Sequence, residues 1–203
     1  MPTSASGAAR ARVLDAAMSL FGRQGYRATT IAQIERAAGL SPGAGGLYRH
    51  FASKRAVLEA GVDRQIENAP PLTAFFEPSS ATGAPDAASR AHFVAVARAA
   101  LRRLDGEGDV NRLLLRDLAD FPDLRDRVRD HELRQVHGAL AAWLQSQASG
   151  TDVDIDALAA VLMSAVSHYW IMTDALGDYP LDVDEERFLA TLADVTARML
   201  GPA

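Results

Sequence analysis

The sequence predicts an all-α protein in which a small head of short helices precedes a larger helical body. Apolar residues recur at spacings of three and four along most of the chain, and no run alternates as a β-strand would. Serine, threonine or aspartate precedes several of these patterns and glycine or proline follows them, as at helix ends. The 203 residues are 48% hydrophobic and include no cysteine, so we expect a core without disulfides or Cys-ligated zinc.

The first two helices have clear end signals. A helix is expected over residues 8–24, followed by Gly25, which can adopt the left-handed conformation of a C′ residue. Thr30 and Gln33 fit a capping box at the start of a second, short helix. This second helix is expected to stop at Gly39.

Two further helix starts and a long loop follow. Ser41 followed by Pro42 is typical of an N-cap and the first position of a helix. Ser53 is expected to cap another helix, which runs over residues 53–68. Prolines and small polar residues make residues 69–88 the predicted loop.

The body is predicted to contain five longer helices. Asp182 begins an Asp-x-x-Glu box that marks the start of the last one. The one candidate for a membrane span, the uncharged run at residues 157–173, is shorter than the roughly 20 apolar residues of a span, and acidic residues flank it. We therefore expect a buried helix there and no membrane partner. The five helices are expected at about 87–104, 109–120, 122–148, 153–176 and 183–200.

Charge divides the chain near the point where the short helices end. The whole chain carries 21 basic and 26 acidic side chains, and its net charge of −5 argues weakly against nucleic-acid binding. Residues 1–60, however, hold eight basic and three acidic side chains, whereas residues 61–203 hold thirteen and twenty-three. A basic segment joined to an acidic one indicates nucleic-acid contact by one end. We predict a head over 1–60 and a body over 61–203, joined by the helix at 53–68.

A helix-turn-helix candidate lies in this head, where two short helices follow a longer one. Its residues read, in order, Ala16-Ala17, Leu20-Phe21, Gly25-Tyr26, Thr29-Thr30-Ile31, Ile34, Ala37-Ala38-Gly39-Leu40-Ser41, Leu47-Tyr48-Arg49-His50-Phe51 and Ser53-Lys54. This succession resembles the tetracycline-repressor (TetR) family of transcriptional regulators over about residues 10–60. The resemblance implies a three-helix DNA-binding head on a helical ligand-binding and dimerisation domain, with double-stranded operator DNA as a partner.

Several head residues are suited to contact DNA. Thr29 and Thr30 have hydroxyls at a helix start, where backbone N–H groups attract anions, and Thr30 is the better candidate for the cap. Tyr48 has a flat body and a hydroxyl that suit a sugar-phosphate strand. Lys54, the only lysine, begins a helix, and the resemblance implies that it contacts the DNA backbone. The predicted DNA contacts are Thr29, Thr30, Ala44, Gly45, Tyr48, Arg49, His50 and Lys54.

The spacing within this segment departs from the family pattern. Ser41 and Tyr48 are seven residues apart, where the family usually has five. Either the turn is longer, or the recognition helix begins near Ala44. Three glycines in the interval each disfavour a helix by about 1 kcal/mol, so we expect this segment to be only partly ordered without DNA.

The two C-terminal helices are the expected homodimer interface. The helix at 153–176 is apolar around most of its circumference and must be covered on most sides. The helix at 183–200 repeats apolar residues at spacings of four, three and four. Two such helices from each subunit would form a two-fold interface, which matches a pseudo-palindromic operator. The alternative is that both helices are ordinary core.

A small-molecule effector is expected to bind among the middle helices, although the sequence identifies neither the effector nor its pocket. Aromatic and histidine side chains there are candidates for the lining, and core packing is the alternative for each. They are Phe75, Phe76, His92, Phe93, His137, Trp143, His168, Tyr169 and Trp170.

Enzyme classes find little support. The chain has no cysteine nucleophile, Gly-x-Ser-x-Gly elbow, phosphate loop or His-Glu-x-x-His pair, so no catalytic, cofactor or metal residues are predicted. We predict a cytoplasmic homodimeric regulator, a repressor that a small ligand releases from its operator. The alternative is a helical small-molecule carrier that never binds DNA, which the basic head disfavours.

Overall fold

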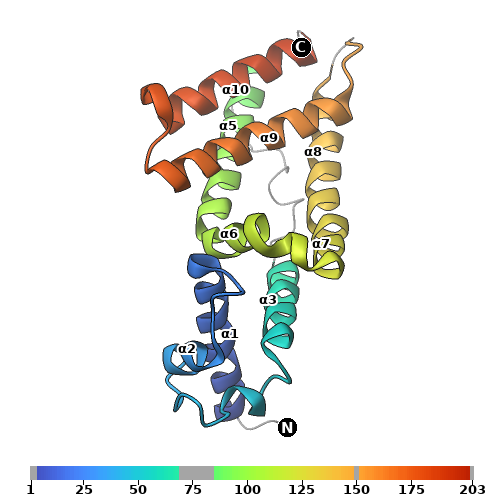
Figure 1. The fold of residues 1–203 in the computed structure, drawn as a ribbon. Coiled ribbons are helices and arrows are strands. Elements are labelled where there is room, and N and C mark those ends of the chain that lie inside the picture. The colour runs from blue at the N-terminus through green and yellow to red at the C-terminus, as the bar shows by residue number, and fades with distance from the viewer. Residues whose placement is uncertain (1–3, 69–84, 149–150, 202–203) are drawn as a thin grey trace. The chain divides into compact units, whose positions relative to one another are not determined.

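Every element is helical in residues 4–68, 85–148 and 151–201, which are the residues that the computed structural model describes (Figure 1). The predicted all-α fold is therefore confirmed. Phe75 and Phe76, two candidates for the lining of the effector site, lie outside the described residues.

The chain forms two compact units that do not follow the order of the sequence. The first unit contains Met1–Ala69 and Glu107–Glu132, and the second contains Pro70–Gly106 and Leu133–Ala203. The N-terminal unit thus includes a segment that the sequence assigned to the body. A division of functions at residue 60 remains a prediction.

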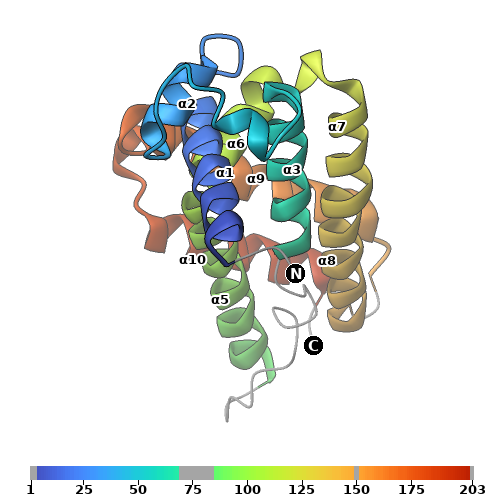
Figure 2. The ribbon, with the colours of Figure 1, turned by 90° about the horizontal axis from the view of Figure 1, so that it is seen from below.

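The first unit is built around α1 (Ser4–Gln24). Three other helices pack against it: α2 (Ile31–Ala37), α3 (Lys54–Asn68) and α6 (Gly108–Asp117) (Figures 1 and 2). The remaining elements of the unit are η1 (Leu47–Arg49), η2 (Leu118–Asp120) and α7 (Pro122–Val128). Its fully buried side chains include Phe21, Ile34, Leu47, Leu58 and Leu124.

The contact between α1 and α6 is unusually close. A methyl group at Gly22 would overlap the Asp109 backbone, so only glycine allows the two helices to approach this far. Ser19 donates a hydrogen bond to the Asp109 carboxylate at 2.8 Å. Arg116 donates to the carbonyl oxygens of Phe21 and Gly22, at 2.5 and 3.1 Å, and so satisfies groups at the end of α1. These contacts join the segment after residue 107 to the head.

The predicted helix ends in the head are present. Gly25 has a φ of 94°, in the left-handed region, directly after α1. The Thr30 hydroxyl accepts from the Gln33 N–H at 3.2 Å, and the Gln33 side chain accepts from the Thr30 N–H at 2.7 Å, which completes the capping box. The Ser53 hydroxyl accepts from the Ala56 N–H at 3.0 Å at the start of α3.

The second unit contains α5 (Pro85–Gly106), α8 (Arg134–Gln147), α9 (Ile155–Leu176) and α10 (Glu185–Leu200). Its core includes the fully buried Leu144, Ala159 and Leu189. The rings of Tyr169 and Phe188 stack with their centroids 4.3 Å apart. By length and composition α9 could span a membrane, but this is weak support for a span, because core helices of soluble proteins pass the same test.

The ends of the predicted body helices agree with the structure to within about two residues, but some interiors differ. The helical run expected over 122–148 consists of α7, a π-helical turn at Arg129–Leu133, and α8 in place of one regular helix. The pattern over 109–120 ends in the 3₁₀ turn η2. The last four residues of the predicted loop 69–88 already belong to α5.

The predicted cap of the last helix is wrong. Asp184, and not Asp182, caps α10 by accepting from the Arg187 N–H at 2.8 Å. Asp182 lies in the 3₁₀ turn η4 (Pro180–Asp182) and has a φ of 56°. Asp184 has the same short side chain as Asp182 and lies closer to the unpaired N–H groups of the first turn of α10.

Candidate nucleic-acid interface

The segment between α2 and α3 does not form the expected recognition helix. Gly43 and Gly45 have φ angles of 79° and 72°, in the left-handed region that interrupts an α-helix. Residues 42–46 form successive turns, and the only helical part is the single 3₁₀ turn η1. The prediction of a helix start at Ser41 and Pro42 is therefore wrong, and so is the alternative start near Ala44. The longer spacing is accommodated by a longer turn, which we call the reading turn (residues 42–49).

At the end of the reading turn and just after it, two buried side chains enclose exposed ones. Leu47 is fully buried, and Phe51, four residues later, is 5% exposed, so the two anchor the turn in the head core. Between them Tyr48 is 55% exposed and Arg49 is also exposed, whereas His50 is half-buried. The hydrophobic anchors thus leave Tyr48 and Arg49 available to a partner.

Ala44 and Gly45, two of the predicted DNA contacts, differ in exposure. Ala44 is exposed, and its N–H donates to the Ser41 carbonyl oxygen at 3.2 Å. Gly45 is half-buried, and its carbonyl oxygen accepts from the Tyr48 N–H at 3.1 Å. Because Gly45 has no Cβ, another backbone can approach its Cα closely.

The two threonines have different surroundings. Thr30 is exposed and acts as the cap of α2, as predicted. Thr29 is only 1% exposed, and its hydroxyl donates to the Gly25 carbonyl oxygen at 2.7 Å and accepts from Gln24 at 3.2 Å. In this structure the Thr29 hydroxyl cannot reach a phosphate, and it closes the turn between α1 and α2 instead.

Lys54 is likewise engaged inside the head. Its ammonium donates to the carbonyl oxygens of Tyr26 and Thr29, at 2.8 and 2.9 Å, and lies 4.2 Å from the centroid of the Tyr26 ring. Partial burial lowers the pKa of the Lys54 ammonium. These contacts hold the ammonium against the turn between α1 and α2.

Sequence reasoning missed Glu35, the fully buried acidic residue of α2. Its carboxylate accepts from the Gly43 N–H at 2.7 Å and from the Leu47 N–H at 3.0 Å. Hydrogen bonds from Leu47, Gly43 and Gly46 lower the pKa of the Glu35 carboxyl, against a smaller opposite effect of burial. Two features of the sequence could have indicated this role. Glu35 directly follows the core residue Ile34, and a glycine-rich turn, whose N–H groups need acceptors, begins seven residues later.

Among the described residues, some arginines of the head are paired with carboxylates and others are not. Arg27 pairs with Asp120 at 2.9 Å, and Arg55 pairs with Asp123 at 2.6 Å and with Glu59 at 2.8 Å. In the described part of the chain, Arg23, Arg36 and Arg49 contact no carboxylate. Acidic residues of the 107–132 segment therefore neutralise two arginines but leave the exposed arginines of α2 and the reading turn uncompensated.

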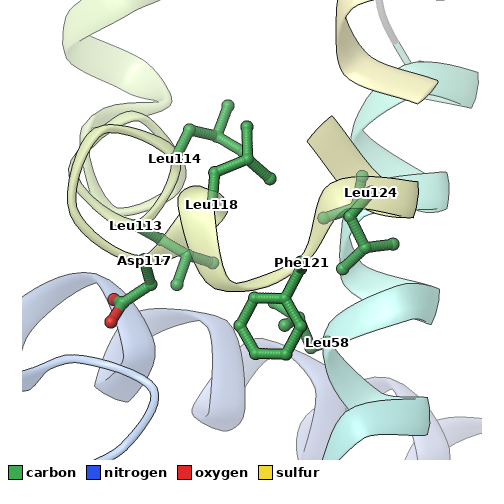
Figure 3. A pocket seen from close by; sticks show the side chains of 8 residues that line it. Leu58, Leu113, Leu114, Asp117, Leu118, Phe121 and Leu124 are labelled. Carbon is green, nitrogen blue, oxygen red and sulfur yellow. The ribbon is translucent and has the colours of Figure 1, made fainter. Parts of the chain in front are cut away.

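The cavity described in the first unit is too small for an effector. It lies between α3, α6, η2 and α7 and has about 190 Å³ of empty space, part of it open to solvent, whereas ligand pockets hold roughly 300 Å³ or more (Figure 3). Its lining is apolar except for Asp117, whose carboxylate accepts from the Tyr26 N–H at 3.3 Å. None of the residues proposed from the sequence as effector contacts lines it.

Comparison with known proteins identifies relatives of the head and of the whole fold. Residues 13–60 match the profile of the tetR family of bacterial regulatory proteins. The chain is 25% identical over 184 residues to YvkB of Bacillus subtilis (strain 168), an uncharacterised HTH-type transcriptional regulator, covering 88% of this chain and 89% of the relative.

Solved structures share the fold over nearly the whole length. A TetR transcriptional regulator of Chloroflexus aurantiacus J-10-FL has a TM-score of 0.69 at 23% identity, covering 94% of each chain. A proposed TetR-family regulator of Mesorhizobium loti MAFF303099 has a TM-score of 0.67 at 17% identity, covering 94% of this chain and 96% of its own.

Proposed function

We propose that this chain, which belongs to the TetR family of bacterial regulatory proteins and is a DNA-binding transcriptional regulator, is a homodimeric repressor. In this proposal the reading turn contacts operator DNA. One observation carries the proposed site. Tyr48 and Arg49 face solvent between the buried anchors Leu47 and Phe51, and Arg49 contacts no carboxylate in the described residues. An uncompensated base beside an exposed aromatic hydroxyl suits a phosphate strand and adjacent base edges.

The proposed contacts divide by role. Tyr48, Arg49 and His50 would bind through their side chains, whereas Ala44 and Gly45 would allow close approach of the backbone. At the start of α2, Thr30 would add a hydroxyl beside the helix N-terminus. Thr29 and Lys54 would act mainly by fixing the turn between α1 and α2, with one N–H of Lys54 directed to a phosphate.

The proposed dimer interface uses α9 and α10. Val161 and Leu176 on α9 are 62% and 60% exposed, and Val195 and Met199 on α10 are 48% and 45% exposed. Large apolar side chains exposed on two neighbouring elements of one unit favour burial against a second copy. A two-fold pairing of this kind would present two heads to a pseudo-palindromic operator.

The effector is proposed to bind in the second unit. There His92 Nε2 and Trp170 Nε1 are buried and have no hydrogen-bond partner in the described structure. Unsatisfied polar groups in an apolar core favour a ligand that supplies the missing acceptors or donors. Such a ligand releases the operator only to the extent that it prefers the conformation that binds DNA poorly. We place this regulator in the cytoplasm, where its DNA is accessible.

The test begins with selection of bound sequences from a random double-stranded DNA pool by the purified full-length protein. A selected duplex and a scrambled duplex of equal length are then titrated by fluorescence anisotropy over a range of salt concentrations. We expect salt-dependent binding that favours the selected duplex, with two chains per duplex. Absence of binding to either duplex at every salt concentration would favour the carrier without DNA binding.

A further inference from the structure

Glu35 is a buried carboxylate whose only partners in the described structure are backbone N–H groups. Its oxygens accept from Gly43 and Leu47, and no arginine, lysine or histidine contacts it there. A buried charge is costly unless hydrogen bonds satisfy it. The head therefore gains from this carboxylate only if the reading turn keeps its N–H groups aimed at it.

The reading turn is shaped around this carboxylate. Left-handed φ angles at Gly43 and Gly45 bend the chain back, so that N–H groups four residues apart point to one side chain. A Cβ at Gly46 would lie 3.7 Å from Glu35 Oε1 and 3.2 Å from the Leu40 side chain. The backbone thus passes directly over Glu35, and the glycines permit both the bends and the close approach.

We propose that Glu35 is the positioning residue of the DNA-reading turn, holding through its carboxylate the conformation that directs Tyr48 and Arg49 toward the duplex. In a regular recognition helix, successive backbone hydrogen bonds fix the side chains that read DNA. Here the left-handed glycines interrupt that ladder, and the carboxylate bridges the gap between Gly43 and Leu47. This inference rests on the proposed function of the head.

The same arrangement determines which groups can contact phosphates. The N–H groups of Gly43 and Leu47 point inward to Glu35, so they are not available to DNA. Side chains of this turn, chiefly Tyr48 and Arg49, then carry more of the contact, which gives their orientation a direct effect on affinity. The three glycines suggested partial order without DNA, whereas the Glu35 hydrogen bonds favour a turn that is fixed in advance.

Substitution of Glu35 by glutamine separates positioning from simple electrostatics, because the two predict opposite signs. Glu35→Gln removes a negative charge from the head, so long-range electrostatics alone predicts tighter binding to any DNA. Glutamine keeps the length of the side chain but has only one acceptor oxygen. Its NH₂ group is a donor and cannot accept a hydrogen bond, so one of the two backbone N–H groups loses its acceptor. Positioning therefore predicts weaker binding to the selected duplex.

The experiment compares Glu35→Gln with Glu59→Gln as full-length proteins. Glu59 lies on α3, pairs with Arg55 at the surface, and gives the same change of charge in the same unit. We measure dissociation constants for the selected and scrambled duplexes, together with amide hydrogen exchange at Gly43, Leu47 and residues 13–21.

For Glu35→Gln we expect about tenfold weaker binding to the selected duplex and about tenfold faster exchange at Gly43 and Leu47. Binding to the scrambled duplex should weaken less than binding to the selected duplex, because the loss of a negative charge offsets part of the lost phosphate contact. Exchange in residues 13–21 should be unchanged. For Glu59→Gln we expect binding to the selected duplex no weaker than that of the wild type, with unchanged exchange.

The outcomes separate the inference from the proposed function. Glu35→Gln with wild-type affinity for the selected duplex would overturn the inference alone. A wild-type protein that binds neither duplex would overturn both. If Glu35→Gln loses protection in residues 13–21 and is therefore unfolded, Glu35→Asp replaces it, because it keeps the charge but withdraws the carboxylate. Weaker selected-duplex binding by Glu35→Asp supports positioning, and wild-type binding overturns it.

Discussion

The Lys54 ammonium donates a hydrogen bond to the carbonyl oxygen of Tyr26 at 2.8 Å and lies 4.2 Å from the centroid of the ring of the same residue. A second bond, to the Thr29 carbonyl oxygen, ties the start of α3 to the turn between α1 and α2. The only lysine of the chain is thus a structural link in the head. Its sequence position suggested a phosphate contact and gave no sign of this link.

Replacement of Lys54 by alanine is expected to lower the stability of the head. The substitution leaves two partly buried carbonyl oxygens without their donor, and we expect the free energy of unfolding to fall by about 1–3 kcal/mol. Urea unfolding followed by circular dichroism measures the change. The matched control is Arg36→Ala, which removes an exposed base of α2 and should change stability by no more than about 0.5 kcal/mol. Equal stability of Lys54→Ala and wild type would contradict this role.

Removal of the Tyr48 hydroxyl is expected to affect DNA binding without affecting the fold. Tyr48 is 55% exposed, so Tyr48→Phe should leave the unfolding free energy within about 0.5 kcal/mol of the wild type. Binding to the selected and scrambled duplexes should weaken together, because a phosphate contact carries no sequence information. Leu47→Ala is the contrasting variant, since loss of a fully buried leucine should cost about 2–5 kcal/mol. Unchanged binding by Tyr48→Phe would remove Tyr48 from the interface.

The ionised Glu35 carboxylate should make the head sensitive to acid. Hydrogen bonds from the reading turn place its folded-state pKa below the ordinary value of 4.5. Because the folded state favours the ionised form, its contribution is complete above pH 4.5 and is lost as the pH falls through the folded-state pKa. Urea unfolding of the wild type and Glu35→Gln over pH 3–7 should give a stability difference that is constant between pH 7 and 5 and shrinks below pH 4.5. A difference that grows toward acid pH would contradict the assigned pKa direction.

Gly22 should tolerate no side chain, although it lies inside a helix where alanine is intrinsically preferred. A methyl group there would overlap the Asp109 backbone, so Gly22→Ala should force α6 away from α1 and destabilise the first unit by about 1–3 kcal/mol. Gly7→Ala is the control on the same helix, since no atom lies within 4 Å of the added methyl group. That variant should gain about 0.5–1 kcal/mol. Thermal unfolding of both variants measures these changes in stability. Equal changes in stability for Gly22→Ala and Gly7→Ala would contradict the close packing of α6 on Gly22.

Sequence reasoning succeeded where local chemistry determines the structure. The capping box of Thr30 and Gln33, the Ser53 cap and the left-handed Gly25 each depend on residues within four positions. Tyr48, a predicted DNA contact, is exposed, as such a contact requires.

Sequence reasoning failed where contacts between residues distant in the chain determine the structure. The packing of α6 on Gly22 joins positions 87 residues apart in the chain, so no local pattern assigns that helix to the head. The role of Glu35 depends on the fold of a turn that begins seven residues later. The partners of Lys54 come from a turn 25 residues or more before it. Periodicity and motif spacing contain no information of this kind.

The most direct test of the account compares wild type and Arg49→Ala on the selected and scrambled duplexes. Anisotropy titrations at a series of salt concentrations give the dissociation constants and the slope of affinity against salt. The account predicts that the wild type prefers the selected duplex, and that Arg49→Ala binds it at least about tenfold more weakly with a salt slope smaller by about one. Equal affinity of wild type and Arg49→Ala for the selected duplex would contradict the assignment of the reading turn as the DNA-binding site.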